Sequence, residues 1–153
     1  MTKLTLQTGA PNEIIMQREF AAPRALVIHA MTTPELIQRW LGGKRASVLK
    51  ASVDLRVGGR YRYVFRRTDG GEFAFGGEYR ELADDRIVQT EKFDDYPSES
   101  TVTTTFTEIA GKTLVRIAVA FESQAVRDMV MKSGMTEGAG ESYDQLEALL
   151  AAQ

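Results

Sequence analysis

The sequence predicts a single α+β domain in which a curved antiparallel sheet wraps around a long C-terminal helix. Residues 47–121 alternate between apolar and polar side chains and are interrupted by turn signals, which is typical of an antiparallel meander. Residues 136–152 instead place Ala139, Tyr143, Leu146 and Leu150 on one helical face. The 153 residues fit one domain, and a chain of this size buries roughly 68–70% of its unfolded surface.

Composition excludes several classes of protein. Apolar residues make up 43% and charged residues 26% of the chain, which is typical of a globular protein. The absence of Cys excludes disulfides, thiolate nucleophiles and Cys-ligated metals. A net charge of −2 argues against nucleic-acid binding. No signal peptide or membrane span is visible, so we expect a cytoplasmic protein, with a flexible segment at residues 1–12 before a domain at residues 13–153.

The expected elements begin with a strand at residues 14–21. Pro23 then starts a helix that runs to about Met31, and a second short helix from Pro34 ends at Gly42-Gly43. Six strands follow, at residues 47–56, 60–68, 73–82, 86–93, 101–109 and 113–121. A helix at residues 124–133 is broken by Gly134 before the last helix.

The hairpin around Gly70-Gly71 admits two registers. A two-residue loop would pair Tyr63 with Glu78, whereas a three-residue loop with a bulge would pair Tyr63 with Tyr79 and Phe65 with Gly77. We favour the bulged register because it keeps the aromatic side chains on one face, although it sets Arg62 opposite Arg80. In either register, one face of the strand expected at residues 60–68 carries Tyr61, Tyr63 and Phe65. The other face carries Arg60, Arg62 and Arg66.

The order strand, two short helices, six strands and long C-terminal helix is the helix-grip order, and local sequences match a known family. The matching segments are Arg18 to Arg24, Thr33 to Leu36 with Arg39 to Gly42, Asp54 to Gly59, Gly77 to Leu82, Ser133 to Gly138, and Glu141 to Leu146. On these segments the chain resembles the activator-of-heat-shock-protein-90-ATPase-like branch of the SRPBCC (START-like) superfamily. The resemblance covers nearly the whole chain from Glu13. It implies a cavity between sheet and last helix that holds hydrophobic or amphipathic ligands in relatives, but it implies no reaction.

Two positions depart from the family's pattern. Ala139 stands where the pattern often has Trp or Met, and Arg45-Ala46 lacks a bulky aromatic residue that often follows the glycine turn. Smaller side chains at both places are expected to enlarge the pocket or open its mouth.

Aromatic walls with a few hydroxyl groups suit small-molecule sites. The side chains expected to line the pocket are Trp40, Tyr61, Tyr63, Phe65, Phe75, Tyr79, Glu91, Phe93, Phe106, Met135, Ala139 and Tyr143. Tyr96 is a further aromatic candidate, and Met129, Met131 and Met135 are candidates for an adaptable lip. The alternative is that these residues only fill the core.

Glu91 is the candidate for acid–base chemistry. It alternates with Gln89 and Phe93, so it faces the cavity if they do, and an apolar pocket would raise the pKa of its carboxyl. The alternative is that the strand turns Val88 inward, which leaves Glu91 exposed or paired with an arginine.

The remaining charged residues support weaker hypotheses. His29 is the sole histidine, so a triad or a metal site would have to use it; surface exposure is the alternative. Seven arginines could form a surface for an anion or a protein partner on the outer face of the sheet. The alternative is that they pair across strands with Glu78, Glu81 and nearby acids. These residues are Arg56, Arg60, Arg62, Arg66, Arg67, Arg80 and Arg86. No cofactor or metal is expected.

Three functions remain open from the sequence. The first is a binding or carrier module for a small hydrophobic or amphipathic ligand. The second is a cyclase, hydratase or hydrolase that uses Glu91 with a tyrosine as acid and base. The third is a chaperone-associated protein that uses the arginine face, and self-association is also open.

Overall fold

The computed structural model describes residues 3–7, 9–96 and 98–152, and in these residues eight antiparallel strands form one curved sheet. The strands are β1 (Thr5–Gln7), β2 (Glu13–Phe20), β3 (Ala46–Val53), β4 (Arg60–Arg67), β5 (Glu72–Ala83), β6 (Arg86–Phe93), β7 (Ser100–Ile109) and β8 (Lys112–Ala120), and the helices are α1 (Arg24–Thr32), α2 (Pro34–Trp40), α3 (Gln124–Lys132) and α4 (Met135–Ala151). The sheet order is β1-β2-β8-β7-β6-β5-β4-β3. This architecture confirms the predicted helix-grip fold.

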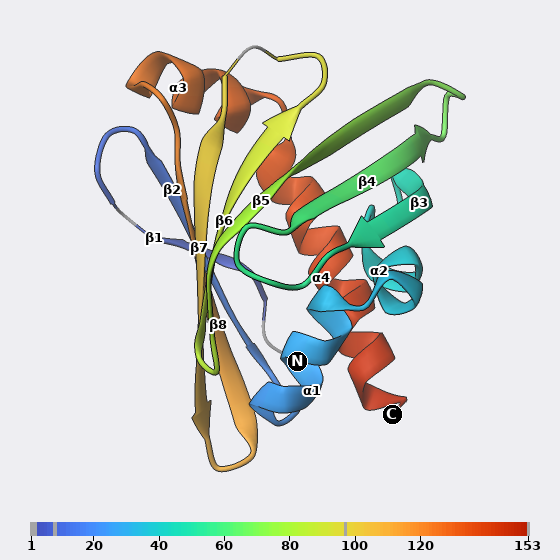
Figure 1. Ribbon diagram of the computed structural model, residues 1–153, viewed down its shortest axis with the longest axis vertical. Coiled ribbons are helices and arrows are strands. Elements are labelled where there is room, and N and C mark those ends of the chain that lie inside the picture. The colour runs from blue at the N-terminus through green and yellow to red at the C-terminus, as the bar shows by residue number, and fades with distance from the viewer. Residues whose placement is uncertain (1–2, 8, 97, 153) are drawn as a thin grey trace.

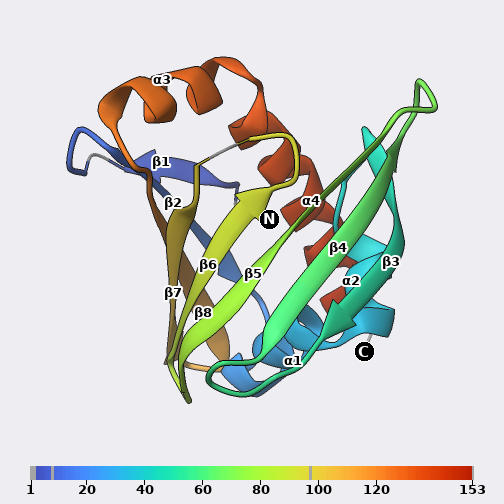
Figure 2. The same ribbon diagram turned by 45° about the horizontal axis from the view of Figure 1, so that its top comes forward.

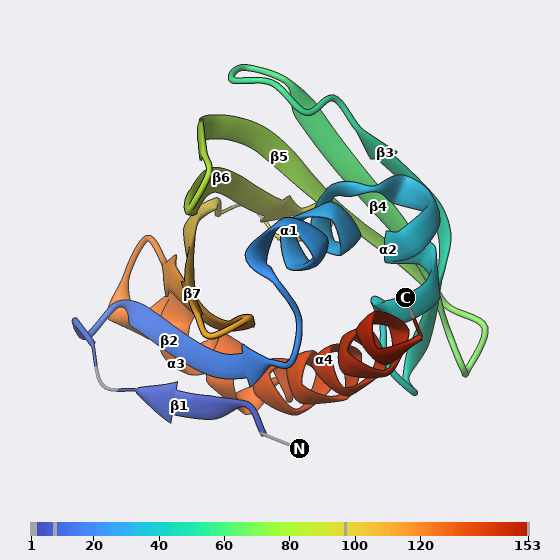
Figure 3. The same cartoon turned by 90° about the horizontal axis from the view of Figure 1, so that it is seen from below.

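The sheet curves around α4 without closing. Seen from below, the strands form an open ring, and α4 lies across the gap between the β2 side and the β3 side (Figure 3). Helices α1 and α2 lie toward one end of this ring, and α3 lies over the other end (Figures 1 and 2). The concave face of the sheet therefore looks onto α4, and this arrangement places the core and the cavity between them.

Part of the N-terminal segment forms a strand. Thr5–Gln7 pairs with β2 as the edge strand β1, and the flexibility expected of residues 1–12 stays a prediction. The Thr5 hydroxyl donates to the Gln17 carbonyl at 3.2 Å, and Leu4 packs against the core. Pairing satisfies backbone groups of β2 that would otherwise form the edge of the sheet.

Both registers expected for the Gly70 hairpin are wrong. Tyr63 lies opposite Phe75, and Phe65 lies opposite Phe73. The turn is centred earlier than expected, because the Arg67 N–H donates to the Gly71 carbonyl at 2.7 Å, and Gly70 adopts a φ of 93° that suits glycine. The aromatic side chains still share one face. Arg62 lies opposite Gly76 rather than Arg80, so the expected repulsion is absent.

Helix α4 is fixed along its C-terminal half. Arg18 of β2, which is 3% exposed, donates to Asp144 and Glu147 at 2.7 Å each. Ser142 accepts from the Gly42 N–H at 3.0 Å, and Gln145 donates to the Gly43 carbonyl at 3.1 Å. These contacts tie the helix to β2 and to the loop between α2 and β3.

The arginines outside the concave face are mostly paired with acids, some across strands as the alternative predicted and some within one strand or loop. Arg62 makes two contacts with Asp94, at 2.9 and 2.6 Å. Ion pairs also join Arg66 to Glu72, Arg80 to Glu78, Arg86 to Glu81 and Arg56 to Asp54. Arg67 differs from this group, because it alternates with Tyr63 and Phe65 and lies on the concave side, where it contributes to the cavity.

Candidate functional site

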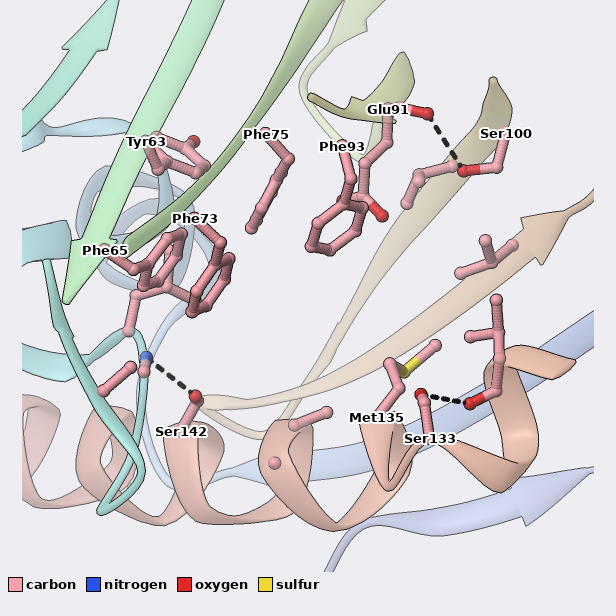
Figure 4. Close-up of a pocket in the computed structure, with 18 of the residues that line it drawn as sticks. Tyr63, Phe65, Phe73, Phe75, Glu91, Phe93, Ser100, Ser133, Met135 and Ser142 are labelled. Carbon is pink, nitrogen blue, oxygen red and sulfur yellow. Dashed lines mark hydrogen bonds between the residues drawn. The ribbon is translucent and has the colours of Figure 1, made fainter. Parts of the chain in front are cut away.

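A cavity of about 630 Å³ lies between the concave face of the sheet and α4. Its size falls within the range typical of small-molecule sites, roughly 300–1,000 Å³. Figure 4 shows aromatic side chains projecting from the strands on one side and α4 passing on the other. The interior is mainly apolar, with buried lining residues such as Met16, Ile37 and Val119.

One side of the cavity is an aromatic wall, formed by Tyr63 and Phe65 of β4, Phe73 and Phe75 of β5, and Phe93 of β6. The Phe65 and Phe73 rings are stacked, with centroids 4.6 Å apart and an interplanar angle of 2°. Phe75 continues this row to Phe93 at 4.7 Å. The centroid spacings match the distance between neighbouring strands, about 4.7–4.9 Å, so the register of the sheet sets the stacking.

The opposite side is formed by small residues of α4. Gly138, Ala139 and Ser142 line the cavity, and a Cβ added at Gly138 would meet no atom within 4 Å. Arg45 and Ala46 line it as well. The two departures from the family pattern therefore lie on the cavity, and the space opposite Gly138 is not refilled by neighbours.

The structure divides the expected pocket residues into two groups. The residues that line the cavity are Trp40, Tyr63, Phe65, Phe75, Glu91, Phe93, Met135, Ala139 and Tyr143. Tyr61, Tyr79 and Phe106 do not line it and are buried in the core instead. The Tyr61 hydroxyl, for example, donates to the Thr90 carbonyl at 2.5 Å. Which of the lining residues bind a ligand remains a prediction.

Glu91 extends from β6 into the cavity beside Phe93 (Figure 4). Among the described residues, no side chain donates a hydrogen bond to its carboxylate, and no Lys or Arg lies within 4.0 Å of it. Ile87 is buried and Gln89 lines the cavity, so the alternative orientation of β6, with Val88 inward and Glu91 exposed, is wrong. Burial raises the pKa of the Glu91 carboxyl to about 7.

Two tyrosines accompany this carboxyl in the lining. Burial, supplemented by the nearby charge of Glu91, raises the pKa of the Tyr143 phenol above its ordinary value. The pKa of Tyr63 is raised as well, chiefly by burial. Both phenols therefore stay protonated at neutral pH, where they can donate hydrogen bonds to a bound molecule but cannot act as phenolate nucleophiles.

The mouth of the cavity consists of its exposed lining residues: Arg45, Arg67, Asp95, Tyr96, Met129 and Ser133. Helix α3 contributes Val126, Met129 and Val130 to this end, and none of its residues is buried. Of the methionines expected to form a lip, Met129 and Met135 line the cavity and Met131 does not. Arg67 and Phe73 were not predicted to line the pocket, although alternation with Phe65 in β4 and with Phe75 in β5 is a signal that could have placed them there.

His29 lies on the surface, away from this cavity. It is exposed, and its Nδ1 atom lies 3.2 Å from the Thr33 hydroxyl. Within residues 3–7, 9–96 and 98–152, no three His, Asp or Glu side chains are grouped so that they could hold a metal ion. No helix in these residues is long and apolar enough to cross a membrane.

The amino-acid sequence matches one known protein family over most of its length. The sequence pattern of the family described as activator of Hsp90 ATPase homolog 1-like protein matches residues 21–151. The chain belongs to this family. The activator of Hsp90 ATPase homolog 1-like family is of the SRPBCC type, which confirms the resemblance inferred from the sequence. Its fold suggests a ligand-binding or carrier-type domain.

Solved structures of bacterial proteins share this fold over almost their full length. A protein from Rhodobacter sphaeroides is 25% identical with a TM-score of 0.93, and the alignment covers 99% of each chain. One from Nitrosomonas europaea is 26% identical with a TM-score of 0.86, over 95% of this chain and 97% of the other. One from Chromobacterium violaceum is 30% identical with a TM-score of 0.81, over 92% and 97%. None of the curated proteins matches the chain.

Proposed function

We propose that this protein binds a small hydrophobic or amphipathic molecule in the cavity and serves as a binding or carrier module. The observation that carries this proposal is the open volume of about 630 Å³ between the aromatic wall and the small residues of α4. An apolar molecule of suitable shape would remove both surfaces from water, which contributes roughly 25 cal/mol for each Å² of apolar surface buried. The few polar groups at Glu91, Tyr63 and Tyr143 are suited to orienting its polar end.

The test combines native mass spectrometry with a defined probe. Protein purified from its own host is examined for a co-purified small molecule, and N-phenyl-1-naphthylamine, an uncharged aromatic fluorophore, is titrated into the ligand-free protein. Ala139→Trp fills the cavity from α4, whereas Ala148→Trp makes the same change at an exposed position of the same helix. We expect saturable binding in wild type and Ala148→Trp, and its loss in Ala139→Trp. Binding that survives Ala139→Trp would place the probe outside the cavity.

A second candidate function is acid–base catalysis on the bound molecule. The observation that favours it is the Glu91 carboxyl, which faces the cavity, accepts no hydrogen bond from the described side chains and has a pKa raised to about 7. A general acid or base works best when its pKa lies near the operating pH. Glu91 would transfer a proton to or from the ligand, while Tyr63 or Tyr143 donates a hydrogen bond to the oxygen where negative charge develops.

This enzymatic hypothesis has its own test. The molecule found by native mass spectrometry is incubated with wild type and with Glu91→Gln, and products are followed by mass spectrometry. Turnover that is lost in Glu91→Gln, with the affinity for N-phenyl-1-naphthylamine unchanged, supports catalysis. A molecule that binds and leaves wild-type protein unaltered supports the carrier function alone.

A further inference from the structure

The charged groups that line the cavity are separated by sign. Arg45 and Arg67 lie on the β3–β4 side, whereas Glu91 and Asp95 lie on β6 and in the turn that follows it. Glu91 also lies deeper than Arg67. From the register, the two residues are six positions apart along the strands, four from Arg67 to Tyr63 and two from Phe93 to Glu91. At ~3.4 Å per residue this separation is about 20 Å.

Arg67 is a cation at the mouth, and no acidic side chain in the described part of the chain forms an ion pair with it. Its guanidinium lies over the Phe73 ring, 4.7 Å from the centroid, and among the described residues no carboxylate lies within 4.0 Å. Asp69 in the adjoining turn instead accepts from the Gly71 N–H at 2.8 Å. By contrast, Arg45 is paired with Glu141 at 3.3 Å. The contact with the Phe73 ring places the Arg67 guanidinium at the wall and leaves its N–H donors available for an anion.

The aromatic wall favours the same kind of ligand. Phe65 and Phe73 are stacked, so each ring covers one face of the other and can turn its C–H edge toward a molecule in the cavity. Ring edges carry partial positive charge and attract the π-face of another aromatic ring in a T-shaped arrangement. The aromatic wall ends at the Arg67 guanidinium, which has no carboxylate of the described residues within 4.0 Å. Together they are complementary to an electron-rich, flat molecule with a negative group.

We propose that the cavity selects flat aromatic molecules that carry an anionic group, with the rings against the aromatic wall and the anion bound by Arg67. The orientation follows from the acidic groups, because Glu91 at the inner end and Asp95 after β6 disfavour an anion near them and leave the Arg67 side of the mouth as the favourable place for negative charge. This inference rests on the proposed binding function and adds the chemical class of the ligand. A carboxylate, sulfonate or phosphate would meet the guanidinium in the same way.

Two fluorescent probes that differ by one charged group separate this inference from simple apolar binding. 8-Anilinonaphthalene-1-sulfonate has the ring system of N-phenyl-1-naphthylamine with an added sulfonate. Both are titrated into wild type, Arg67→Gln and Arg60→Gln. Arg60 lies on the same strand, is exposed, and points to the convex face, so its variant removes an equal charge away from the cavity. Circular dichroism verifies that each variant is folded.

We expect Arg67→Gln to weaken binding of the sulfonate about tenfold, because a hydrogen bond to a charged group is lost. The affinity for the uncharged probe should stay unchanged, and Arg60→Gln should bind both as wild type does. Equal sulfonate affinity in wild type and Arg67→Gln, or an equal loss for both probes, overturns the inference while apolar binding stands. If wild type binds neither probe, the proposed binding function is overturned and this inference with it.

Discussion

The guanidinium of Arg18 in β2 donates to the carboxylate of Glu147 in α4 over 2.7 Å, and the arginine side chain is only 2% exposed. Asp144 receives the second contact at the same distance but is 60% exposed. The arginine is therefore the member that cannot regain water when the contact breaks. The Arg18 Nε atom is already buried with no hydrogen-bond partner among the described residues, so the two carboxylates are the main compensation for the buried guanidinium.

The double substitution Asp144→Asn with Glu147→Gln should be more destabilising than Arg18→Met. The double variant leaves a buried cation without a carboxylate, which costs about 3–5 kcal/mol. Arg18→Met retains an apolar chain in the core and leaves carboxylates that can turn toward water, so its cost should be less than half as large. Urea unfolding at neutral pH measures both free energies. The reverse order would show that packing by the arginine stem outweighs its charge.

Glu91 should make stability depend on pH. Its folded pKa is raised to about 7 from an ordinary value of 4.5, so the folded state binds more protons than the unfolded state between these values. Stability contributed by this group is thus present below about pH 4.5 and is lost as pH rises to about 7. The free energy of unfolding of Glu91→Gln relative to wild type should rise by about 2 kcal/mol from pH 5 to pH 8. Urea titrations at the two pH values measure this change, and an equal difference at both would contradict a buried carboxyl.

Two glycine-to-alanine substitutions should act in opposite directions. A Cβ at Gly140 of α4 meets no atom within 4 Å, so Gly140→Ala should stabilise the protein by about 0.5–1 kcal/mol through helix propensity. A Cβ at Gly77 would lie 1.9 Å from the Thr90 carbonyl oxygen, so Gly77→Ala must displace backbone and should destabilise. Thermal unfolding compares the two, and a stabilising Gly77→Ala would contradict the close approach of β5 and β6.

Trp40→Phe should lower stability by about 2–3 kcal/mol, since it removes packing volume and leaves a buried carbonyl unpaired. The indole Nε1 donates to the Ala30 carbonyl at 2.9 Å, and both residues are buried. Tyr96→Phe is the matched control, because Tyr96 is exposed and the change is expected to cost less than about 0.5 kcal/mol. Similar losses in the two variants would show that the indole hydrogen bond contributes little.

Alternation predicted which side chains share a face but not how strands align. The bulged register placed Tyr63 opposite Tyr79, whereas the structure places it opposite Phe75, four residues away. A shift by an even number of residues leaves every side chain on its face, so the hydrophobic pattern cannot detect it. The turn decided the alignment, and the sequence offered several positions near Gly70 for it.

The candidate site was predicted in part for the same reason. Periodicity placed Tyr61, Tyr79 and Phe106 on the concave face correctly, but it gives no depth along a strand, and these residues lie where the core is filled. Glu91 could be placed because its strand has an unbroken alternation with Phe93. The stacking of Arg67 on Phe73 depends on the hairpin register, so it could not be derived before the register was known.

The uneven attachment of α4 has a consequence for how this fold can diversify. Ser142, Asp144, Gln145 and Glu147 hold the second half of the helix to the sheet and to the loop after α2. Residues 138–140 precede these contacts, and Gly138 and Ala139 border the cavity. Mutations in this turn can resize the binding space while the anchoring contacts persist. Substitutions within this one helical turn can therefore change which ligand is accepted, largely independently of the residues on which folding depends.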